Sequence, residues 1–581
     1  MSFYNKLKND INLIIKNEIL KNKYKKEFFS MFHVNEPPID KFGDISTNIA
    51  FSLSKILKIN TKDFAGLVLK EILKLNYVKE AKIEGPGFIN ISLKNDFWIF
   101  SLIETLTLND KYGESNIGKS KKIIIEFVSA NPTGPLHIGH CRGAVYGDVL
   151  SNIMKKLGYK VFKEYYINDT GTQIDKLTNS VIYRYKELFN KQKEIEKDLY
   201  PGEYLINLAS DLKKKYGSKL LENNKKNNSI IKDFSLKWII DLIKNDLDLL
   251  GVKFDSFYSE SDLIKKNKIS ICLDTLKKNK LIYEGIPEKP KGGDLDEWEP
   301  RKQSLFKSTN FGDDADRALQ KSDGDYTYFA KDIAYHWDKY KRGFSFMINV
   351  WGADHGGYIK RLSSAVKAIT NNKVNIIIKT CQLVRVIDKK KALKMSKREG
   401  KFISLKKVLD NVGKDVTRFI MLLRKNSEDI DFDLEKITEE SKDNPVFYVQ
   451  YAHARCCSVL REAENYFNSK EISLNEIKKN NLKKLNDKNE ILLIKEIVKW
   501  PKIIEDSVYY QEPHRITFFL QSLSSKFHSF WNYGKMDPSK RFINIDNKSL
   551  TLSRLSLIYA VRIILSNGLN LLGVKPLNIM K

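Results

Sequence analysis

The spacing of apolar residues changes near residue 130, which predicts a strand followed by a helix. Ile123–Ile125 form a continuous β-branched run with Val128 close behind, as is typical of a buried parallel strand. Turn-forming residues interrupt the chain at Asn131–Pro135. Beyond them the apolar positions recur at helical spacing, at Leu136, Val145, Val149 and Ile153. A helix is therefore expected to begin close to residue 137.

The same strand-to-helix pattern continues along the middle of the chain. Residues 159–169 are expected to form a second strand, so strand, helix and strand follow within about 45 residues. Such a βαβ unit requires a parallel sheet. Further apolar strands are expected at 346–351 and 374–387, after a Lys-rich helical stretch at about 190–285 that is predicted to be an insertion.

The two ends of the chain have different patterns. Near the N-terminus a helical spacing is followed by a turn and an alternating strand at 83–93, which predicts an α+β domain; the helical positions are Leu7, Ile11, Ile14, Ile15 and Ile19. From about residue 410 onward the pattern is helical, with Gly568 and Gly573 as expected C-terminal caps. We therefore predict domains at 1–112, 113–430 and 431–581, the last an all-α helical bundle.

Composition limits the class of protein. A chain of 581 residues has room for roughly three to four domains. It contains no uninterrupted apolar run of about 18 residues and no signal-like N-terminal segment, so a cytoplasmic protein without a membrane span is expected. The five cysteines form no Cys-x-x-Cys pair, which argues against a zinc site. The formal net charge of +28 suits a polyanionic partner such as RNA, but its even spread also fits a Lys-rich composition without function.

Two histidines stand where the strand delivers its carboxyl end to the predicted helix. His137 and His140 are three residues apart, with Gly139 between them. A helix start presents unpaired N–H groups and the positive end of the helix dipole, which together favour an anion. Imidazole donors at this point can follow charge as it builds up on a phosphate. This stretch is therefore the candidate catalytic site.

The amino-acid sequence of this stretch resembles that of a known family. Glu126–His140 resembles the His-x-Gly-His region of class I aminoacyl-tRNA synthetases, and within them the arginyl-tRNA synthetases; its motif residues are Ala130, Asn131, Pro132, Thr133, Gly134, Pro135, Leu136, His137, Ile138, Gly139 and His140. Downstream, Lys394–Arg398 resembles the Lys-Met-Ser-Lys-Ser loop of the same class, with Arg398 at the last position. Two lysines on a mobile loop can neutralise pyrophosphate as it departs. The resemblance implies a Rossmann-type catalytic domain at 113–430.

The resemblance also assigns roles to individual residues. His137, His140, Lys394 and Lys397 would stabilise the transition state, while ATP would contact Gly139, Gly352, Asp354, His355, Met395 and Ser396. Arginine would be held through its α-amino group by Glu126 and Asn131, and through its side chain by Tyr328 and Asp332. The last pair lies four residues apart on one helical face, and a carboxylate with an oriented acceptor suits a planar, permanently charged guanidinium.

The implied partners are tRNA(Arg), L-arginine and ATP with Mg²⁺, with no tightly bound cofactor, no zinc and no membrane. The expected reaction is arginyl-adenylate formation followed by transfer to the terminal ribose of tRNA, by a monomer that requires bound tRNA for the first step. RNA contacts are expected at Tyr448, Tyr451, Phe527 and Trp531, because single-stranded bases stack on aromatic side chains. The resemblance of the N-terminal region to the extension of arginyl-tRNA synthetases, which meets the outer corner of the tRNA, adds Asn48. Two alternatives stay open: a class I synthetase for another amino acid, and a non-catalytic tRNA-binding paralogue.

Overall fold

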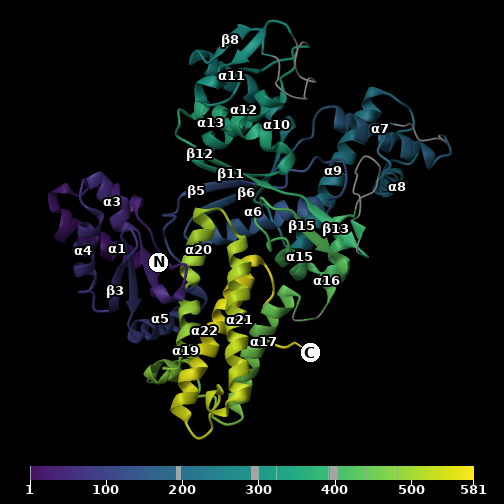
Figure 1. Ribbon diagram of the computed structural model, residues 1–581. Helices are drawn as coiled ribbons and strands as arrows, with labels where there is room; N and C mark the ends of the chain where they lie inside the picture. Colours follow the sequence, from purple (N-terminus) through teal and green to yellow (C-terminus); the bar gives the residue numbers. More distant parts are fainter. Residues whose placement is uncertain are drawn as a thin grey trace. The chain divides into compact units, whose positions relative to one another are not determined.

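The computed structural model (Figure 1) describes residues 2–191, 198–288, 300–321, 323–389, 391–392, 403–439, 441, 443–480 and 482–580. The chain divides into two compact units, one of residues 116–439 and one that combines residues 1–115 with residues 440–581. The predicted N-terminal and C-terminal regions therefore share a unit, and the candidate catalytic residues occupy the other.

A five-stranded parallel sheet forms the centre of the unit 116–439. Its strands run in the order β12-β11-β5-β6-β7, and every neighbouring pair is parallel; their bounds are β5 Lys122–Glu126, β6 Lys160–Ile167, β7 Ser256–Ser259, β11 Phe346–Gly352 and β12 Asn375–Cys381. The predicted β-branched run lies in β5, between β11 and β6, and Ile123–Ile125 are fully buried, as expected of a strand that helices cover on both faces. The predicted parallel sheet is confirmed.

Helices cover both faces of this sheet. Figure 1 draws α6 (Ile138–Lys156) on one side of the strands and α12 (Tyr328–Lys341) with α13 (Ile359–Thr370) on the other. A buried apolar cluster of Ile124, Met347, Leu362 and Val366 joins α13 to β5 and β11. Strand order reverses between β5 and β11, and in such sheets ligands bind at the carboxyl ends of the strands where the order reverses. Glu126 ends one of these strands and Gly352 the other.

The stretch after β6 is only partly the helical insertion that the sequence predicts. It contains α7 Thr172–Glu187, α8 Tyr204–Tyr216, α9 Lys225–Leu250, α10 Glu260–Lys265 and α11 Lys268–Lys278. However, β7 lies inside the range 190–285 and pairs with β6, and β8 (Ile282–Gly285) pairs with β9 (Gln303–Phe306), which in turn pairs with β10 (Arg317–Ala318). Each of these strands has four residues or fewer and lacks a β-branched run. Such a short stretch contains too few positions to show the alternation that identifies a strand.

A second small sheet follows the main one. It orders β14 (Lys391–Ala392), β13 (Val384–Asp388) and β15 (Ile430–Asp433), and three helices lie nearby in sequence: α14 Leu405–Val412, α15 Lys414–Ile420 and α16 Leu434–Thr438. The prediction that the chain is all-helical from about 410 is therefore wrong at β15, which pairs in parallel with β13. The predicted domain start at 431 falls within this strand.

The N-terminal region is the α+β domain that the sequence predicts. Four antiparallel strands run in the order β1-β2-β4-β3; their bounds are Val34–Asn35, Ile45–Thr47, Phe88–Leu93 and Val78–Glu84. The helices are α1 Phe3–Ile14, α2 Phe28–Met31, α3 Ile49–Leu57, α4 Thr61–Ile72 and α5 Asn95–Leu108. The predicted helix face is buried at Leu7, Ile11 and Ile15.

The C-terminal region is a bundle made of α17 Pro445–Glu464, α18 Leu474–Lys479, α19 Lys488–Val498, α20 Trp500–Tyr509, α21 His514–Met536 and α22 Lys548–Leu572. Helix α22 is long and apolar enough to cross a membrane, but 78% of its most apolar window is buried inside the protein, as in a core helix. Gly573 caps it in the left-handed region, as predicted. Gly568 is not a cap: a Cβ there would lie 2.5 Å from the Leu520 side chain, so glycine permits close packing of α21 on α22.

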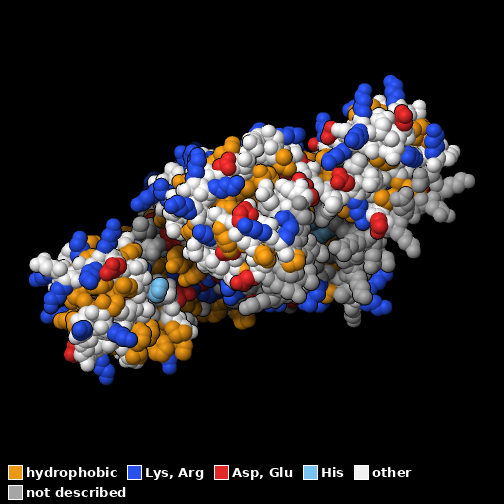
Figure 2. Space-filling model, turned by 90° about the horizontal axis from the view of Figure 1, so that it is seen from above, with side chains coloured by type: hydrophobic (Ala, Val, Ile, Leu, Met, Phe, Trp, Pro, Cys, Tyr) orange, Lys and Arg blue, Asp and Glu red, His pale blue; other side chains and the backbone are white. Residues whose placement is uncertain are grey.

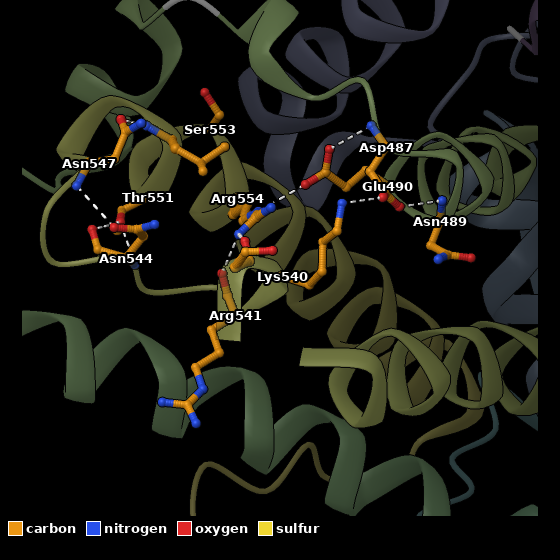
Figure 3. Close-up of polar contacts among 12 residues, drawn as sticks. Asp487, Asn489, Glu490, Lys540, Arg541, Asn544, Asn547, Thr551, Ser553 and Arg554 are labelled. Carbon is orange, nitrogen blue, oxygen red and sulfur yellow. Dashed lines mark hydrogen bonds and ion pairs between the residues drawn. The ribbon is translucent and has the colours of Figure 1, made fainter. Parts of the chain in front are cut away.

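A buried arginine organises the loop between α21 and α22 (Figure 3). The Arg554 guanidinium donates to Glu490 at 2.9 Å and to the carbonyl oxygens of Ser539 at 2.7 Å and Arg541 at 2.6 Å. Lys540 adds an ion pair with Asp487 at 2.8 Å. The loop is thereby fastened to α19 as well as to α22.

Candidate active site

The turn after β5 has a strained backbone. Val128 and Ser129 both have positive φ, +68° and +40°, which is unfavourable for residues with a side chain and most of all for β-branched valine. Side chains hold the turn in place: the Tyr165 hydroxyl donates to the carbonyl of Ala130 at 2.9 Å, and the Tyr166 backbone N–H donates to the Ser129 hydroxyl at 3.1 Å. Strain of this kind persists where the surroundings determine the conformation, as at a binding site.

The two histidines together cap the start of α6. His137 Nδ1 accepts from the Gly139 N–H at 3.1 Å, and His140 Nδ1 accepts from the His137 N–H at 3.2 Å. An Nδ1 that accepts a backbone N–H places the proton of a neutral imidazole on Nε2. Both rings therefore present Nε2–H as a donor, which is what a phosphate oxygen requires. A Cβ on Gly139 would lie 2.9 Å from the His137 ring, so this packing requires glycine.

Residues that follow the second predicted motif in sequence lie against the first motif. The Leu405 N–H donates to the Leu136 carbonyl at 2.8 Å, and Ser404 forms a bridge with His137. The predicted residues Lys394, Met395, Ser396 and Lys397 lie outside the described residues. Of this part of the chain, the structure therefore places only the residues that follow the predicted motif beside the histidines.

One cavity of about 940 Å³ joins most of the predicted site. Of the predicted residues, it is lined by Glu126, Ala130, Asn131, His140, Tyr328, Asp332, Gly352, Asp354 and His355. His137 and Thr133 instead line an adjoining hollow of about 550 Å³, to which Asn131 and His140 also contribute. The structure therefore brings together residues separated by more than 200 positions in sequence.

Asp332 is the exceptional carboxylate of the cavity. It accepts a hydrogen bond from the Tyr358 hydroxyl at 2.8 Å, and no ion pair to it appears among the described residues. The pKa of Asp332 is raised to about 7, mainly by burial and in part by the charges of Glu126 and Glu260, against the opposing effects of the Tyr358 hydrogen bond and Lys339. Such a group gains a great deal from a substrate cation.

Glu126 already has a cation partner. Lys339, whose side chain is fully buried, places Nζ 2.5 Å from the Glu126 carboxylate, and Ser129 donates to the other oxygen at 3.2 Å. Lys339 also reaches Asn349 at 3.4 Å. The predicted contact between Glu126 and an α-amino group would therefore be made by a carboxylate whose charge is already balanced.

Glu260 is a site residue that the sequence did not reveal. It is buried in the first turn of α10 and lines the same cavity as Asp332. It accepts from Tyr166 at 2.9 Å and from Thr170, and it pairs with Lys331 at 2.8 Å. A glutamate in a helix's first turn is common at the surface, so no sequence signal marked it.

The remaining predicted residues of the cavity come from the turn after β5, from the start of α12 and from the end of β11. Asn131 donates to Gln173 of α7 at 2.8 Å. Tyr328, the first residue of α12, is half exposed. Asp354 and His355 follow β11 with their side chains 3.6 Å apart, and a Cβ on Gly352 would overlap the Asp354 carboxylate. These residues follow the carboxyl end of β11, where ligands bind in sheets of this kind.

The predicted RNA-contacting residues belong to the other unit. The Tyr451 side chain is half exposed, and its ring stacks with the ring of His528. The Arg455 guanidinium lies over two rings, with its Cζ 4.3 Å from the centroid of Tyr451 and 4.7 Å from that of Trp531. Tyr448 also contacts His528. Burial and the charge of Arg455 lower the pKa of His528 to about 4, so its ring is neutral at physiological pH. Arg455 and His528 are not among the RNA-contacting residues that the sequence predicts.

The structure argues against one of these predictions, Phe527, and leaves Asn48 a prediction. Phe527 is fully buried and packs against Phe542 and Trp531, so its face is not available to a base. Asn48 stands at the start of α3, where its side chain accepts a hydrogen bond from the His33 N–H at 2.7 Å.

On the face shown in Figure 2, lysine and arginine are scattered without gathering over one element. That face gives no support to a functional reading of the basic excess.

Comparison with known proteins agrees with this geometry. Three family models match: "Arginyl tRNA synthetase N terminal domain" over residues 6–93, "tRNA synthetases class I (R), catalytic domain" over 102–456, and "DALR anticodon binding domain" over 449–580. The chain is 48% identical to an arginine–tRNA ligase of a Wolbachia endosymbiont of Brugia malayi over 94% of its length and 95% of that protein. It is 45% identical to the arginine–tRNA ligase of Rickettsia rickettsii over the full length of both.

A solved structure shows the same fold. Thermus thermophilus arginyl-tRNA synthetase superimposes with a TM-score of 0.73, covering 99% of this chain and all of that one, at 19% identity. At this identity the likeness concerns the fold alone. The catalytic-domain model covers more than half of the chain, and the relatives above match it nearly from end to end. The chain belongs to the arginyl-tRNA synthetases, a family of class I aminoacyl-tRNA synthetases.

Proposed function

We propose that the protein is an arginine–tRNA ligase that activates L-arginine with ATP and transfers it to the terminal ribose of tRNA(Arg). The observation that carries this proposal is the cavity that joins three features: the histidine-capped start of α6, the carboxyl end of β11, and the sheltered carboxylate of Asp332. An anion-binding helix start suits the α-phosphate of ATP, and the strand end suits its nucleoside. Asp332 suits a permanently charged guanidinium.

In the first step the arginine carboxylate attacks the α-phosphate, and arginyl-adenylate and pyrophosphate form. His137 and His140 donate Nε2–H to the phosphate as charge develops, and their reciprocal capping fixes the ring orientations in advance. Lys394 and Lys397 are assigned to the departing pyrophosphate by their motif. No side chain becomes covalently bound, since positioning and electrostatics suffice for phosphoryl transfer.

Arginine is oriented by groups around the carboxyl ends of β5 and β6. Asp332 with Tyr328 receives the guanidinium, and Asn131 lies within reach of the α-amino end beside His140. Glu126 binds the α-amino group of arginine through its carboxylate, whose charge Lys339 balances. The adenosine of ATP is bound by Gly352, Asp354 and His355. The second step passes the aminoacyl group to the terminal ribose of the tRNA.

The proposal has further parts that follow from the family. The region 1–112 and the helical region from 431 bind tRNA, the latter through Tyr448, Tyr451, Arg455 and Trp531. Mg²⁺ arrives with ATP, no zinc is used, and the enzyme acts as a monomer in the cytoplasm. The enzyme activates arginine only when tRNA is bound.

The decisive experiment is aminoacylation of tRNA with each of the twenty amino acids, combined with arginine-dependent pyrophosphate exchange with and without tRNA. Charging with arginine alone, and exchange that begins only when tRNA is added, is the expected result. Charging with another amino acid would overturn the role of Asp332. Tight tRNA binding without any charging would leave a non-catalytic tRNA-binding protein.

A further inference from the structure

The loop between β5 and α6 is held by three successive helices of the same unit. This loop, residues 131–136, contains two prolines and belongs to no helix or strand, so its backbone groups need partners elsewhere. Each helix supplies one side-chain partner: Gln173 of α7 to Asn131, Tyr204 of α8 to the Thr133 carbonyl, and Asp246 of α9 to the Leu136 N–H. The third of these contacts lies directly before the histidine motif.

The Asp246 carboxylate is buried without a cation. Its exposed fraction is 2%, and among the described residues it forms no ion pair; it accepts the Leu136 N–H at 3.1 Å. The pKa of Asp246 is raised to about 6, because burial outweighs the opposing effects of the Leu136 hydrogen bond and the charge of Lys406. A sheltered carboxylate without a counter-ion destabilises a fold, so stability alone does not account for its place.

The end of α9 that carries Asp246 is anchored to α15 and α6. The buried Arg418 of α15 donates to the Leu250 carbonyl at the end of α9, at 3.0 Å, and to Asp148 of α6 at 2.5 Å. A side chain on an anchored element can fix the atom that it contacts. Asp246 therefore gives the Leu136 N–H a fixed position relative to α6, the helix that the histidines cap.

Leu136 passes this restraint to the histidines through two peptide groups. A peptide group is planar, so a hydrogen bond at one of its atoms orients the whole group. Asp246 holds the group before Leu136 through the N–H, and the Leu405 N–H holds the group after it through the carbonyl, at 2.8 Å. The second group also contains the His137 N–H, which donates to His140 Nδ1 at 3.2 Å. The orientation of the His140 ring therefore depends on how both groups are held.

We propose that Asp246 is a positioning residue for adenylate formation: it fixes the Leu136 N–H and thereby the direction in which His140 presents its imidazole to the α-phosphate. Asp246 acts through the backbone and touches no substrate. The inference rests on the proposed function, because its measure is the rate of arginine activation. A reacting group misplaced by about 1 Å can lower a rate about a hundredfold. The loop requires the acceptor oxygen of Asp246 rather than its charge.

The test is arginine-dependent pyrophosphate exchange by the full-length enzyme in the presence of tRNA, with two variants of Asp246. Asp246→Asn keeps an acceptor oxygen in a side chain of the same shape, whereas Asp246→Leu keeps a similar size and leaves the Leu136 N–H without a partner. We expect Asp246→Leu to lower kcat about tenfold to a hundredfold, with the KM for arginine and the Kd for tRNA within about twofold of wild type. Asp246→Asn should retain kcat within about threefold of wild type. A kcat within about twofold of wild type in Asp246→Leu would overturn the inference.

A double-mutant cycle shows whether Asp246 acts through His140. His140→Ala removes the imidazole, so Asp246→Leu added to it should lower kcat by less than about a further twofold. Ile239→Ala is the matched control, since it removes a fully buried side chain of the same helix about two turns away and should weaken folding without this loss of kcat. An equal loss from Asp246→Leu in both backgrounds, or the same loss in Ile239→Ala, would show a general role in folding and overturn the inference.

A second pair of variants acts on the other peptide group, and keeps the inference testable should Asp246→Leu not fold. Leu405 is the first residue of α14, where proline fits a helix, and Ser404 before it has the extended backbone that proline requires. Leu405→Pro and Leu405→Ala both lose the side chain, but only proline loses the N–H. We expect a kcat at least about tenfold lower in Leu405→Pro than in Leu405→Ala. Equal kcat values would overturn the inference, whereas a wild-type enzyme without exchange or charging would refute the proposed function instead.

Discussion

The raised pKa of Asp332 predicts that arginine binding by the wild-type enzyme depends on pH. The guanidinium stays charged throughout the physiological range, so only the ionised form of Asp332 pairs with it. A carboxyl group with a pKa of about 7 is mainly protonated at pH 6 and mainly ionised at pH 8. Arginine binding should therefore strengthen as the pH rises through 7, and bound arginine should itself lower the pKa of Asp332.

The magnitude follows from the same value. With a pKa of about 7, the ionised fraction of Asp332 is about one-eleventh at pH 6 and about ten-elevenths at pH 8. The dissociation constant for arginine should thus fall about tenfold between these pH values, equivalent to about 1.4 kcal/mol. His336 does not contribute, because burial and the charge of Lys339 hold its pKa well below the usual range.

The assay is equilibrium dialysis of labelled arginine with the enzyme–tRNA complex in buffers from pH 6 to pH 8 at constant ionic strength. A second measurement is the increase in melting temperature caused by a fixed arginine concentration, which should be larger at pH 8. Asp332→Asn is the matched control: it binds arginine weakly and without this pH dependence. A dissociation constant that stays level from pH 6 to pH 8 in the wild type would refute the reasoning.

Three further predictions concern packing and recognition. Gly139→Ala places a Cβ against the His137 ring and should lower the kcat for charging about tenfold to a hundredfold with arginine affinity unchanged; an unaltered kcat in pyrophosphate exchange would contradict it. Arg554→Met leaves Glu490 buried without its partner and should lower the free energy of unfolding by about 3–5 kcal/mol in urea titrations, whereas a loss below about 1 kcal/mol would show that the pair is dispensable. Tyr451→Leu removes a half-exposed stacking surface and should weaken tRNA binding by about 1–3 kcal/mol in filter binding, with arginine affinity as the control.

Much of the fold could be predicted because its signals are local. The β-branched run of β5 and the helical spacing of α6 lie within 35 residues, and both elements form where their patterns indicate. Short elements were missed for the same reason. Strands β7 and β15 have four residues each and exist through pairing with β6 and β13. Their local sequence carries too few positions to establish a period.

The candidate site divides in the same way. The histidine motif and the pair Tyr328/Asp332 were recognisable because their residues are adjacent in sequence or one helical turn apart. Glu260 was not, since only the parallel sheet brings α10 beside α12. Phe527 was misjudged because the spacing of aromatic residues on a helix does not reveal which of them face the core.

By itself, the sequence determined the first strand–helix–strand unit, the helix start that suits an anion, and the resemblance to the family, because each is carried by neighbouring residues. Only the tertiary structure decided which charges balance one another. Glu126 meets Lys339 from 213 residues away, and Glu260 meets Lys331 from 71 residues away. Ion pairs of this kind depend on burial and distance, which arise when the helices pack on the sheet. The raised pKa of Asp332, which has no ion pair among the described residues, is therefore a property of the folded site rather than of any stretch of the chain.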